Sequence, residues 1–256
     1  MSGMVGEGFE QWHRTRSIDS CLDLLLEAVA PLGFNAVVYD FAPVPLTHDG
    51  RMIRPNLMRG RGLPRDFVEL WCDRSYYRID PVQQICTSSN MPFIWSLADG
   101  RRQILGRPIL PEHQPAVSYL RDTRLTCGAT VPIHLPAGGL ANVTAIRRDA
   151  EDDFADDARR GLGELILLAH AMNEAACASF DDRIRRCTAI PVTEREVECL
   201  GWAARGKTAQ DIARILGRSV ATVSLHLNNA QRKLGAKNRA QAIARAAHYR
   251  LLGPRL

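Results

Sequence analysis

A stretch near the C-terminus places short polar and basic side chains at helical spacing. The polar residues of 219–233 recur every three or four positions, so they would share the outward side of one helix. Hydroxyl, amide and cationic groups on such a helix can contact base edges in the major groove of DNA, and flanking cations can contact phosphates. The residues with these expected roles are Lys207, Thr208, Ser219, Thr222, His226, Asn229, Arg232, Lys233 and Lys237.

The charge of the chain is concentrated in the same region. Residues 190–256 contain 12 Lys and Arg against 4 Asp and Glu, whereas residues 1–189 contain 21 against 24. A basic module on a slightly acidic body is typical of a protein with a polyanionic partner. A merely solvated basic surface would give the same charge distribution, so charge alone leaves both interpretations open.

Sequence patterns of catalysis are missing from the chain. It contains no G-x-S-x-G, no H-E-x-x-H and no phosphate-binding glycine loop. His113, His134 and His170 lack the spacing of metal ligands. The seven cysteines form no C-x-x-C pair, which favours reduced thiols in apolar gaps. We therefore expect no enzyme activity, no metal and no other cofactor.

The first two thirds of the chain mix helix and strand patterns, which predicts an α+β domain. Asp80 precedes a proline and marks a break in the chain, because a residue in that position avoids the helical region. Pro132 indicates that its strand is an edge strand or carries a bulge. The predicted helices are 8–31, 65–75, 112–124 and 152–178, and the predicted strands are 34–41, 52–57, 128–135 and 140–147, with 93–97 either a short strand or an extended turn.

After residue 190 the pattern is helical throughout. Thr193 and Glu196 form a capping-box pattern, and three further helices are expected to begin after Thr208, Ser219 and Asn238. Two helices joined by a short glycine turn predict a helix-turn-helix, with a generic helical bundle as the alternative. The residues expected to face inward are Val197, Leu200, Ala204, Ile212, Ala213, Ile215, Leu216, Val220, Val223, Leu227, Ala230 and Leu234.

Residues 193–242 closely resemble the DNA-binding domain of the LuxR family. Glu196 and Leu200 match signature positions of that family, and Gly206-Lys207-Thr208 matches its GKT step. Its recognition-helix pattern matches the residues from Thr222 through Leu234. The resemblance implies an all-α, four-helix DNA-binding domain of the LuxR helix-turn-helix type.

Residues 10–175 resemble the autoinducer-binding domain of quorum-sensing LuxR receptors. The matching anchors are Asp80-Pro81, Trp95 and Gly128 at the start of GATVPI. The resemblance implies an α/β/α sandwich that binds a small-molecule autoinducer, with Asp80 accepting a hydrogen bond from the amide of an N-acyl homoserine lactone. The ligand-binding residues that it implies are Phe67, Trp71, Asp80, Trp95 and Thr144.

Three positions of the implied pocket depart from the family pattern, and at one of them the bulkier Trp71 replaces a tyrosine that helps to wall the family's pocket. At the position of Phe67 the family has a tryptophan, and that tryptophan donates a hydrogen bond to the lactone carbonyl. At the position of Leu63 the family often has a tyrosine, and that tyrosine donates to the acyl amide oxygen. Neither Phe67 nor Leu63 donates a hydrogen bond. The resemblance implies a regulator that senses an acyl homoserine lactone or a related small molecule. The alternative is an orphan regulator that answers a non-lactone signal or acts without a ligand.

The predicted organisation is a sensory domain at 1–178, a linker at 179–190 and a helix-turn-helix domain at 191–256. No run approaches the ~18 apolar residues that span a bilayer, and no secretory signal opens the chain. We expect a cytoplasmic homodimer without membrane contact. It would bind a palindromic site on double-stranded DNA, because a dimer presents two recognition helices one turn apart.

Overall fold

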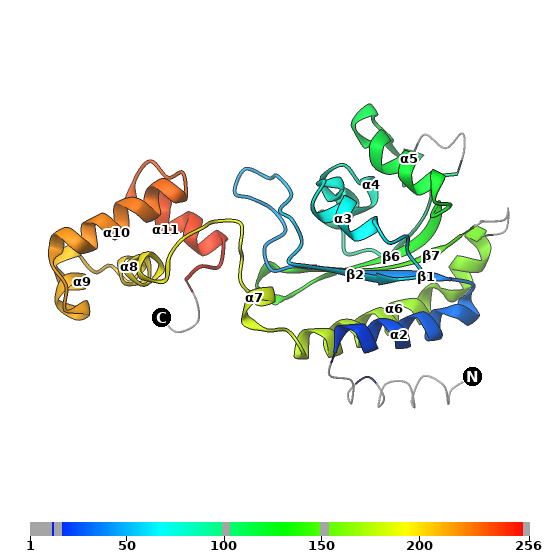
Figure 1. Cartoon of the computed structure of the whole chain (residues 1–256), viewed down its shortest axis with the longest axis horizontal. Helices are drawn as coiled ribbons and strands as arrows, with labels where there is room; N and C mark the ends of the chain where they lie inside the picture. The colour runs from blue at the N-terminus through cyan, green and yellow to red at the C-terminus, as the bar shows by residue number, and fades with distance from the viewer. Residues whose placement is uncertain (1–11, 13–16, 99–102, 149–153, 253–256) are drawn as a thin grey trace. The chain divides into compact units, whose positions relative to one another are not determined.

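The computed structural model of the chain describes residue 12 and residues 17–98, 103–148 and 154–252. These residues divide into two compact units, which are described separately (Figure 1). The first comprises Met1–Pro45 with Met52–Ile184, and the second comprises Leu46–Arg51 with Arg185–Leu256.

A five-stranded sheet forms the centre of the first unit. Its strand order is β2-β1-β7-β6-β3, and all neighbouring strands are antiparallel. Runs of β-branched and aromatic residues favour these strands, and the antiparallel order lets a loop of five residues join β6 to β7. The strands are β1 (Ala36–Ala42), β2 (Leu57–Arg61), β3 (Phe93–Ser96), β6 (Cys127–His134) and β7 (Leu140–Arg147). A separate two-stranded ribbon is formed by β4 (Gln103–Ile104) and β5 (Arg107–Pro108).

Successive side chains of these strands point to opposite faces of the sheet. Val37 and Tyr39 belong to the core on one face, whereas Val38 belongs to the core on the other. The same alternation places Asp40 and Thr144 on the face of Val38. We call the first face the α6 face and the second the α3 face, after the helices that cover them.

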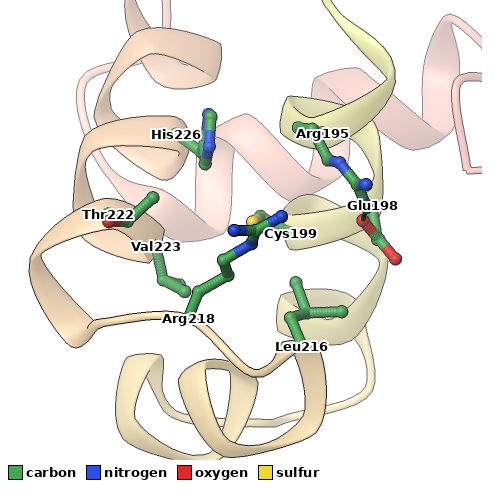
Figure 2. Close-up of a pocket in the computed structure, with 8 residues that line it drawn as sticks. All are labelled: Arg195, Glu198, Cys199, Leu216, Arg218, Thr222, Val223 and His226. Atoms are coloured by element: carbon green, nitrogen blue, oxygen red, sulfur yellow. Dashed lines mark hydrogen bonds and ion pairs between the residues drawn. The ribbon is translucent and has the colours of Figure 1, made fainter.

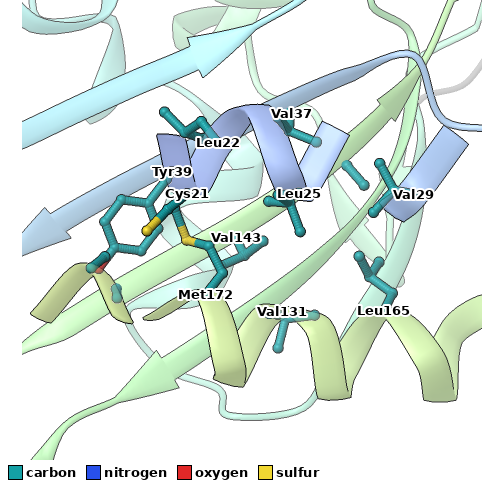
Figure 3. Close-up of a cluster of buried hydrophobic side chains, with 14 of the residues drawn as sticks. Cys21, Leu22, Leu25, Val29, Val37, Tyr39, Val131, Val143, Leu165 and Met172 are labelled. Atoms are coloured by element: carbon teal, nitrogen blue, oxygen red, sulfur yellow. The ribbon is translucent and has the colours of Figure 1, made fainter. Parts of the chain in front are cut away.

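Helices α2 (Ile18–Val29) and α6 (Phe154–Ala178) cover the α6 face (Figures 1 and 3). Their apolar stripes pack against each other and against the strands, and Leu25, Leu165 and Met172 are fully buried there. Burial of one such side chain contributes about 1.5–3 kcal/mol, so this layer is the main structural core of the unit.

The α3 face is covered by three shorter helices, α3 (Phe67–Cys72), α4 (Pro81–Cys86) and α5 (Gln114–Asp122). The predicted break at Asp80 is confirmed, because its backbone is extended. The residue also caps α4, which the sequence analysis did not predict: its side chain accepts a hydrogen bond from Val82 N at 2.8 Å. Proline is tolerated at the first position of a helix, so the break and the new helix coincide.

Two strand predictions need correction. The strand expected at 52–57 lies at Leu57–Arg61 instead, where Arg61 pairs with Val37. Pro132 does not lie on an edge strand, because β6 has neighbours on both sides, and the unbroken register between β6 and β7 has no bulge at Pro132. The pairing with β3 stops at Thr130, however, so Pro132 lies beyond the β3 ladder, where its missing N–H removes no bond to that strand.

The second unit contains four main helices whose caps follow the predicted pattern. Thr193, Thr208, Ser219 and Asn238 each accept a backbone hydrogen bond at the start of a helix. Gly217 has a φ of 62°, a left-handed conformation that suits glycine and produces the turn between two of them. The helices are α8 (Glu194–Ala204), α9 (Ala209–Leu216), α10 (Val220–Lys233) and α11 (Arg239–His248).

The predicted buried face of this unit was wrong at three positions. Ala204 is exposed, and Ile215 and Val220 are 44% and 46% exposed beside the Gly217 turn. The buried side of α8 differs from the predicted one because its first buried residue is Glu196, whose carboxylate is buried, and not an apolar residue. The residues of α8 that are buried are Glu196, Cys199, Leu200, Gly201 and Ala203.

Two predicted helices, 8–31 and 152–178, begin in parts of the chain that the structure does not describe. The corresponding helices, α2 and α6, are described from Ile18 and from Phe154. The predicted linker 179–190 contains a short helix, α7 (Asp182–Arg185). Among the described residues, no helix has the length and apolar character needed to cross a bilayer.

Candidate functional site

A small cavity lies between the α3 face of the sheet and the helices that cover it. All five residues implied as ligand contacts line it, so the structure brings them together although they span 78 positions of the chain. Its volume is about 30 Å³. The lining residues are Val38, Met58, Phe67, Trp71, Asp80, Val82, Gln83, Trp95, Leu120, Thr144 and Ile146.

An aromatic cluster forms one wall of this cavity. The rings of Phe67 and Trp71 are stacked, with centroids 4.1 Å apart and planes inclined by 11°. Tyr119 of α5 and Tyr76 pack against the indole of Trp71 at centroid distances of 5.7 and 5.6 Å. The helical spacing of Phe67 and Trp71 makes the stack, because residues four apart lie on one side of a helix. Sequence reasoning did not assign Tyr76 or Tyr119.

The carboxylate of Asp80 is buried beside this wall. Trp71 Nε1 donates to Asp80 Oδ2 at 2.9 Å, and Val82 N donates to Asp80 Oδ1 at 2.8 Å. Burial raises the pKa of Asp80 above its usual value, and the hydrogen bonds from Trp71 and the backbone of α4 oppose that shift. Asp80 is therefore a desolvated acceptor fixed in one orientation, suited to a polar group of a small molecule.

A chain of hydrogen bonds joins Trp95 of β3 to Thr130 of β6 and Thr144 of β7. Trp95 Nε1 donates to Thr130 Oγ1 at 2.9 Å, and the hydroxyls of Thr130 and Thr144 are 3.0 Å apart. The indole lies over Gly128, where an added Cβ would come within 2.5 Å of the ring. Gly128 thus permits the position of Trp95, and the strand alternation that places Thr144 in the cavity also identifies Thr130.

A second buried carboxylate lies on the same face and was missed by sequence reasoning. Asp40 accepts hydrogen bonds from Gln83 Nε2 at 2.8 Å and from Asn142 Nδ2 at 2.9 Å. Burial raises the pKa of Asp40 to about 7, although these two hydrogen bonds oppose the shift. Its position in a strand with apolar residues on both sides was the available signal, because an aspartate there has no solvent to face.

The second unit has a hollow of about 290 Å³ beside the N-terminal half of α10 (Figure 2). Thr222 and His226 face it from α10, and Arg218 extends into it from the preceding turn. Arg195 and Glu198 lie on its other side, on α8, where they form an ion pair at 2.7 Å. The remaining lining residues are Cys199, Leu216 and Val223.

The residues predicted to contact DNA fall into two groups. Lys207, Arg232 and Lys237 are exposed, and Asn229 accepts a hydrogen bond from Arg232 Nη2 at 3.2 Å. The hydroxyls of Thr208 and Ser219 instead cap α9 and α10. The predicted residues thus lie on α10, in the segment before α9, in the turn between α9 and α10, and in the segment after α10.

Lys233 differs from the other predicted DNA contacts. Its Nζ donates to Glu196 Oε2 at 2.8 Å, and the same oxygen accepts a hydrogen bond from Thr193 N at 2.7 Å. Burial alone would raise the pKa of Glu196, but the hydrogen bonds from Lys233 and Thr193 outweigh it and the pKa is lowered. Lys233 therefore fixes α10 against α8, which orients the outward side chains of α10.

Two family models cover most of the chain. The Autoinducer binding domain matches residues 17–176, and the luxR family of bacterial regulatory proteins matches residues 191–246. The first range contains the cavity, and the second contains α8, α9 and α10. The two matches agree with the two resemblances that the sequence motifs indicate.

Relatives and solved structures agree with the family models. The quorum sensing-dependent transcriptional regulator RpaR of Rhodopseudomonas palustris is 33% identical over 218 residues, 85% of this chain and 82% of its own length. The activator LuxR of Aliivibrio fischeri is 25% identical over 91% of this chain and 87% of its own length. The fold is that of Escherichia coli SdiA, with a TM-score of 0.61, 22% identity and 98% coverage of both chains. The chain therefore belongs to the LuxR family of transcriptional regulators, which join an autoinducer-binding domain to a DNA-binding helix-turn-helix.

Proposed function

We propose that this regulator binds a small molecule in the cavity of the α3 face through Phe67, Trp71, Asp80, Trp95 and Thr144. The observation that supports this most strongly is the buried carboxylate of Asp80, held by Trp71 beside an aromatic wall. Pockets for small molecules combine apolar walls with a few fixed polar groups, and this cavity has that composition.

The ligand in this proposal is an N-acyl homoserine lactone or a related small molecule. Pockets for such ligands measure roughly 300–1,000 Å³, whereas this cavity measures about 30 Å³. We propose that binding moves α3, α4 and α5 outward from the sheet, because the sheet itself is held by the core of the α6 face. The small volume of the cavity and the missing donors at Phe67 and Leu63 also favour the alternative of an orphan regulator, which answers a non-lactone signal or needs none.

We further propose that α10 enters the major groove of DNA, with Thr222, His226, Asn229 and Arg232 towards the bases. Lys207, Lys237 and the loops at Thr208 and Ser219 would contact phosphates, which supply most of the non-specific affinity. Lys233 would act mainly by holding α10 in place. In this proposal the regulator is a homodimer, whose two α10 helices would be related by a two-fold axis and would bind the two halves of a palindromic promoter site. The sensory domain would span 1–178, the linker 179–190 and the DNA-binding domain 191–256.

The same proposal places the regulator in the cytoplasm and assigns it no catalysis. A LuxR-type regulator acts on DNA, and no group of three His, Cys, Asp or Glu side chains suited to a metal ion occurs within the described ranges. Lactone hydrolysis measured with the purified protein tests this part, and turnover above the buffer rate would contradict it.

The ligand is tested by thermal shift of the full-length protein with N-octanoyl homoserine lactone and octanoyl-glycerol. A complex of octanoyl-rac-glycerol with SdiA has been solved, which suggests the second probe. A ligand that binds only the folded state raises the Tm, and the variant Asp80→Asn is expected to reduce that shift. Retardation of promoter fragments with and without each probe tests DNA binding. Retardation without a Tm shift or a ligand response would favour the orphan alternative.

A further inference from the structure

Leu225 is an exposed apolar residue of α10 to which the sequence motifs give no role. It is 57% exposed, more than any other large apolar residue of the second unit within the described ranges. A single exposed leucine is common on protein surfaces and needs no explanation by itself. The position of this one on α10, among residues that are proposed to meet DNA, is what gives it a meaning.

The exposed residues of α10 form one line along the helix. After Val220 at the first position of the helix, the exposed residues are Ala221, Leu225, Asn228 and Arg232. Intervals of four, three and four positions place these residues on one side of a helix. The line runs opposite the buried Val223 and Ala230, so it is the part of α10 that projects furthest from the core of the unit.

This line includes the side of α10 that is proposed to face the bases. Arg232 Nη2 donates to Asn229 Oδ1 at 3.2 Å, so these two proposed base contacts lie together. Leu225 precedes them by four and seven positions and lies on the same side of the helix. Thr222 and His226 are half-buried and face the hollow of Figure 2, so Leu225 extends further outward than they do.

The chemistry of the major groove determines what an outward leucine can contact there. The apolar group that base edges present in this groove is the C5-methyl group of thymine. A leucine against a polar base edge would displace water without replacing its hydrogen bonds. Against a methyl group, the same leucine removes apolar surface from water on both sides of the contact.

We infer that Leu225 packs against the C5-methyl group of a thymine and thereby selects a T·A base pair at one position of the DNA site. This inference rests on the proposed entry of α10 into the major groove. It adds an apolar contact to the polar ones, so Leu225 determines sequence specificity without forming a hydrogen bond.

The first experiment selects binding sites from a library of random duplexes with the full-length wild type and, separately, with Leu225→Ala. The residue is exposed, so the variant should remain folded, which its Tm verifies. We expect the wild-type sites to share a thymine at a position where the Leu225→Ala sites show no preference, while the preferences at other positions remain. Leu225→Met keeps an apolar side chain of similar reach and should keep the thymine.

The second experiment removes the methyl group from the DNA instead of the leucine from the protein. Each thymine of one selected site is replaced in turn by deoxyuridine, which has the same hydrogen-bonding edge without the methyl group. Fluorescence anisotropy should show that one replacement weakens wild-type binding roughly fourfold, as expected for one buried methyl group, and leaves the binding of Leu225→Ala unchanged. Val220→Ala is the matched control: Val220 is 46% exposed on α10 but lies on another side of the helix, so this variant should keep the fourfold response.

The outcomes distinguish this inference from the function on which it rests. If wild type and Leu225→Ala select the same thymines, or respond equally to every deoxyuridine, the role of Leu225 is overturned and DNA binding by α10 is left intact. If the wild type enriches no duplex from the library, with or without N-octanoyl homoserine lactone, the proposed DNA binding fails, and the inference fails with it.

Discussion

The two units place their polar functional groups in opposite environments. In the first unit Asp40, Asp80, Thr130 and Thr144 are at most 9% exposed and hydrogen bond to other buried groups. In the second, Lys207, Thr208 and Lys237 lie at the surface. The difference matches the two partners: a small ligand must be surrounded, whereas a DNA duplex can be met only by an outward surface.

This difference has an energetic consequence. A buried polar group that loses its partner costs about 1–3 kcal/mol, so substitutions in the cavity should change stability and ligand affinity together. Surface substitutions usually change stability by less than about 0.5 kcal/mol, so substitutions at exposed positions of the DNA-binding unit should change DNA affinity alone. Four predictions test this contrast, beginning with the largest expected effect.

The largest effect is expected from Trp71→Ala. The indole is 1% exposed, and truncation of a buried tryptophan destabilises by about 3–5 kcal/mol through lost packing. Urea unfolding of the full-length protein measures the change. Trp71→Phe keeps most of the volume and loses the bond to Asp80, so it should cost about 1–2 kcal/mol. Leu225→Ala, at a position 57% exposed in the second unit, should change stability by less than about 0.5 kcal/mol. Similar losses in Trp71→Ala and Leu225→Ala would refute the contrast.

The second prediction concerns the pH dependence that Asp40 gives to the first unit. Its folded-state pKa of about 7 lies above the usual 3.8, so the folded protein binds the proton more tightly than the unfolded chain. The contribution to stability is complete below about pH 4 and is lost as the pH rises through about 7. Relative to Asp40→Asn, the wild type should lose about 2–3 kcal/mol between pH 5 and pH 8. Parallel stability curves for the two proteins would show that burial does not shift this carboxyl group.

The third prediction concerns Glu196, the buried carboxylate that breaks the pattern of the second unit. Glu196→Gln can keep the capping hydrogen bond to Thr193 N but loses the charge that pairs with Lys233. We expect a loss of about 1–2 kcal/mol, because a hydrogen bond to a charged group contributes more than a neutral one. Glu198→Gln is the matched control, since that residue forms only a surface pair with Arg195, and surface pairs contribute about 0–1 kcal/mol. An equal loss of stability in both variants would show that Glu196 contributes no more to stability than a surface carboxylate does.

The sequence was sufficient for much of the second unit, because its signals are local. Capping residues and glycine turns act within one or two turns of a helix, so Thr193, Ser219 and Gly217 were identified correctly. The capping role of Glu196 was identified correctly, but its burial was not predicted. Its burial depends on Lys233, which is 37 positions away, and helical periodicity carries no information about such a partner.

The cavity was less accessible to sequence reasoning, because its polar groups meet through the sheet. The five candidate ligand contacts came from the family resemblance, and the structure places all five around one cavity. Strand alternation alone would have placed Asp40, Asn142 and Thr144 on one face, yet Gln83 reaches that face from a helix whose orientation depends on tertiary packing. Asp80 showed the limit of a local rule: the proline after it correctly indicated a break, but the same geometry begins α4.

The smallest expected effect on stability is that of His226→Ala on α10. The side chain is half-buried and faces the hollow of Figure 2, so its removal should change the Tm by no more than about 2 °C. If α10 lies in the major groove, loss of a base contact should weaken binding to a specific promoter fragment about tenfold and binding to random DNA much less. Lys237→Ala should weaken both to a similar extent and reduce the salt dependence by about one counterion, because a phosphate contact carries no sequence information. Fluorescence anisotropy at several salt concentrations separates the two patterns. A fall in stability with His226→Ala, or equal losses on both DNAs, would place His226 in the architecture of the unit and not in its reading of DNA.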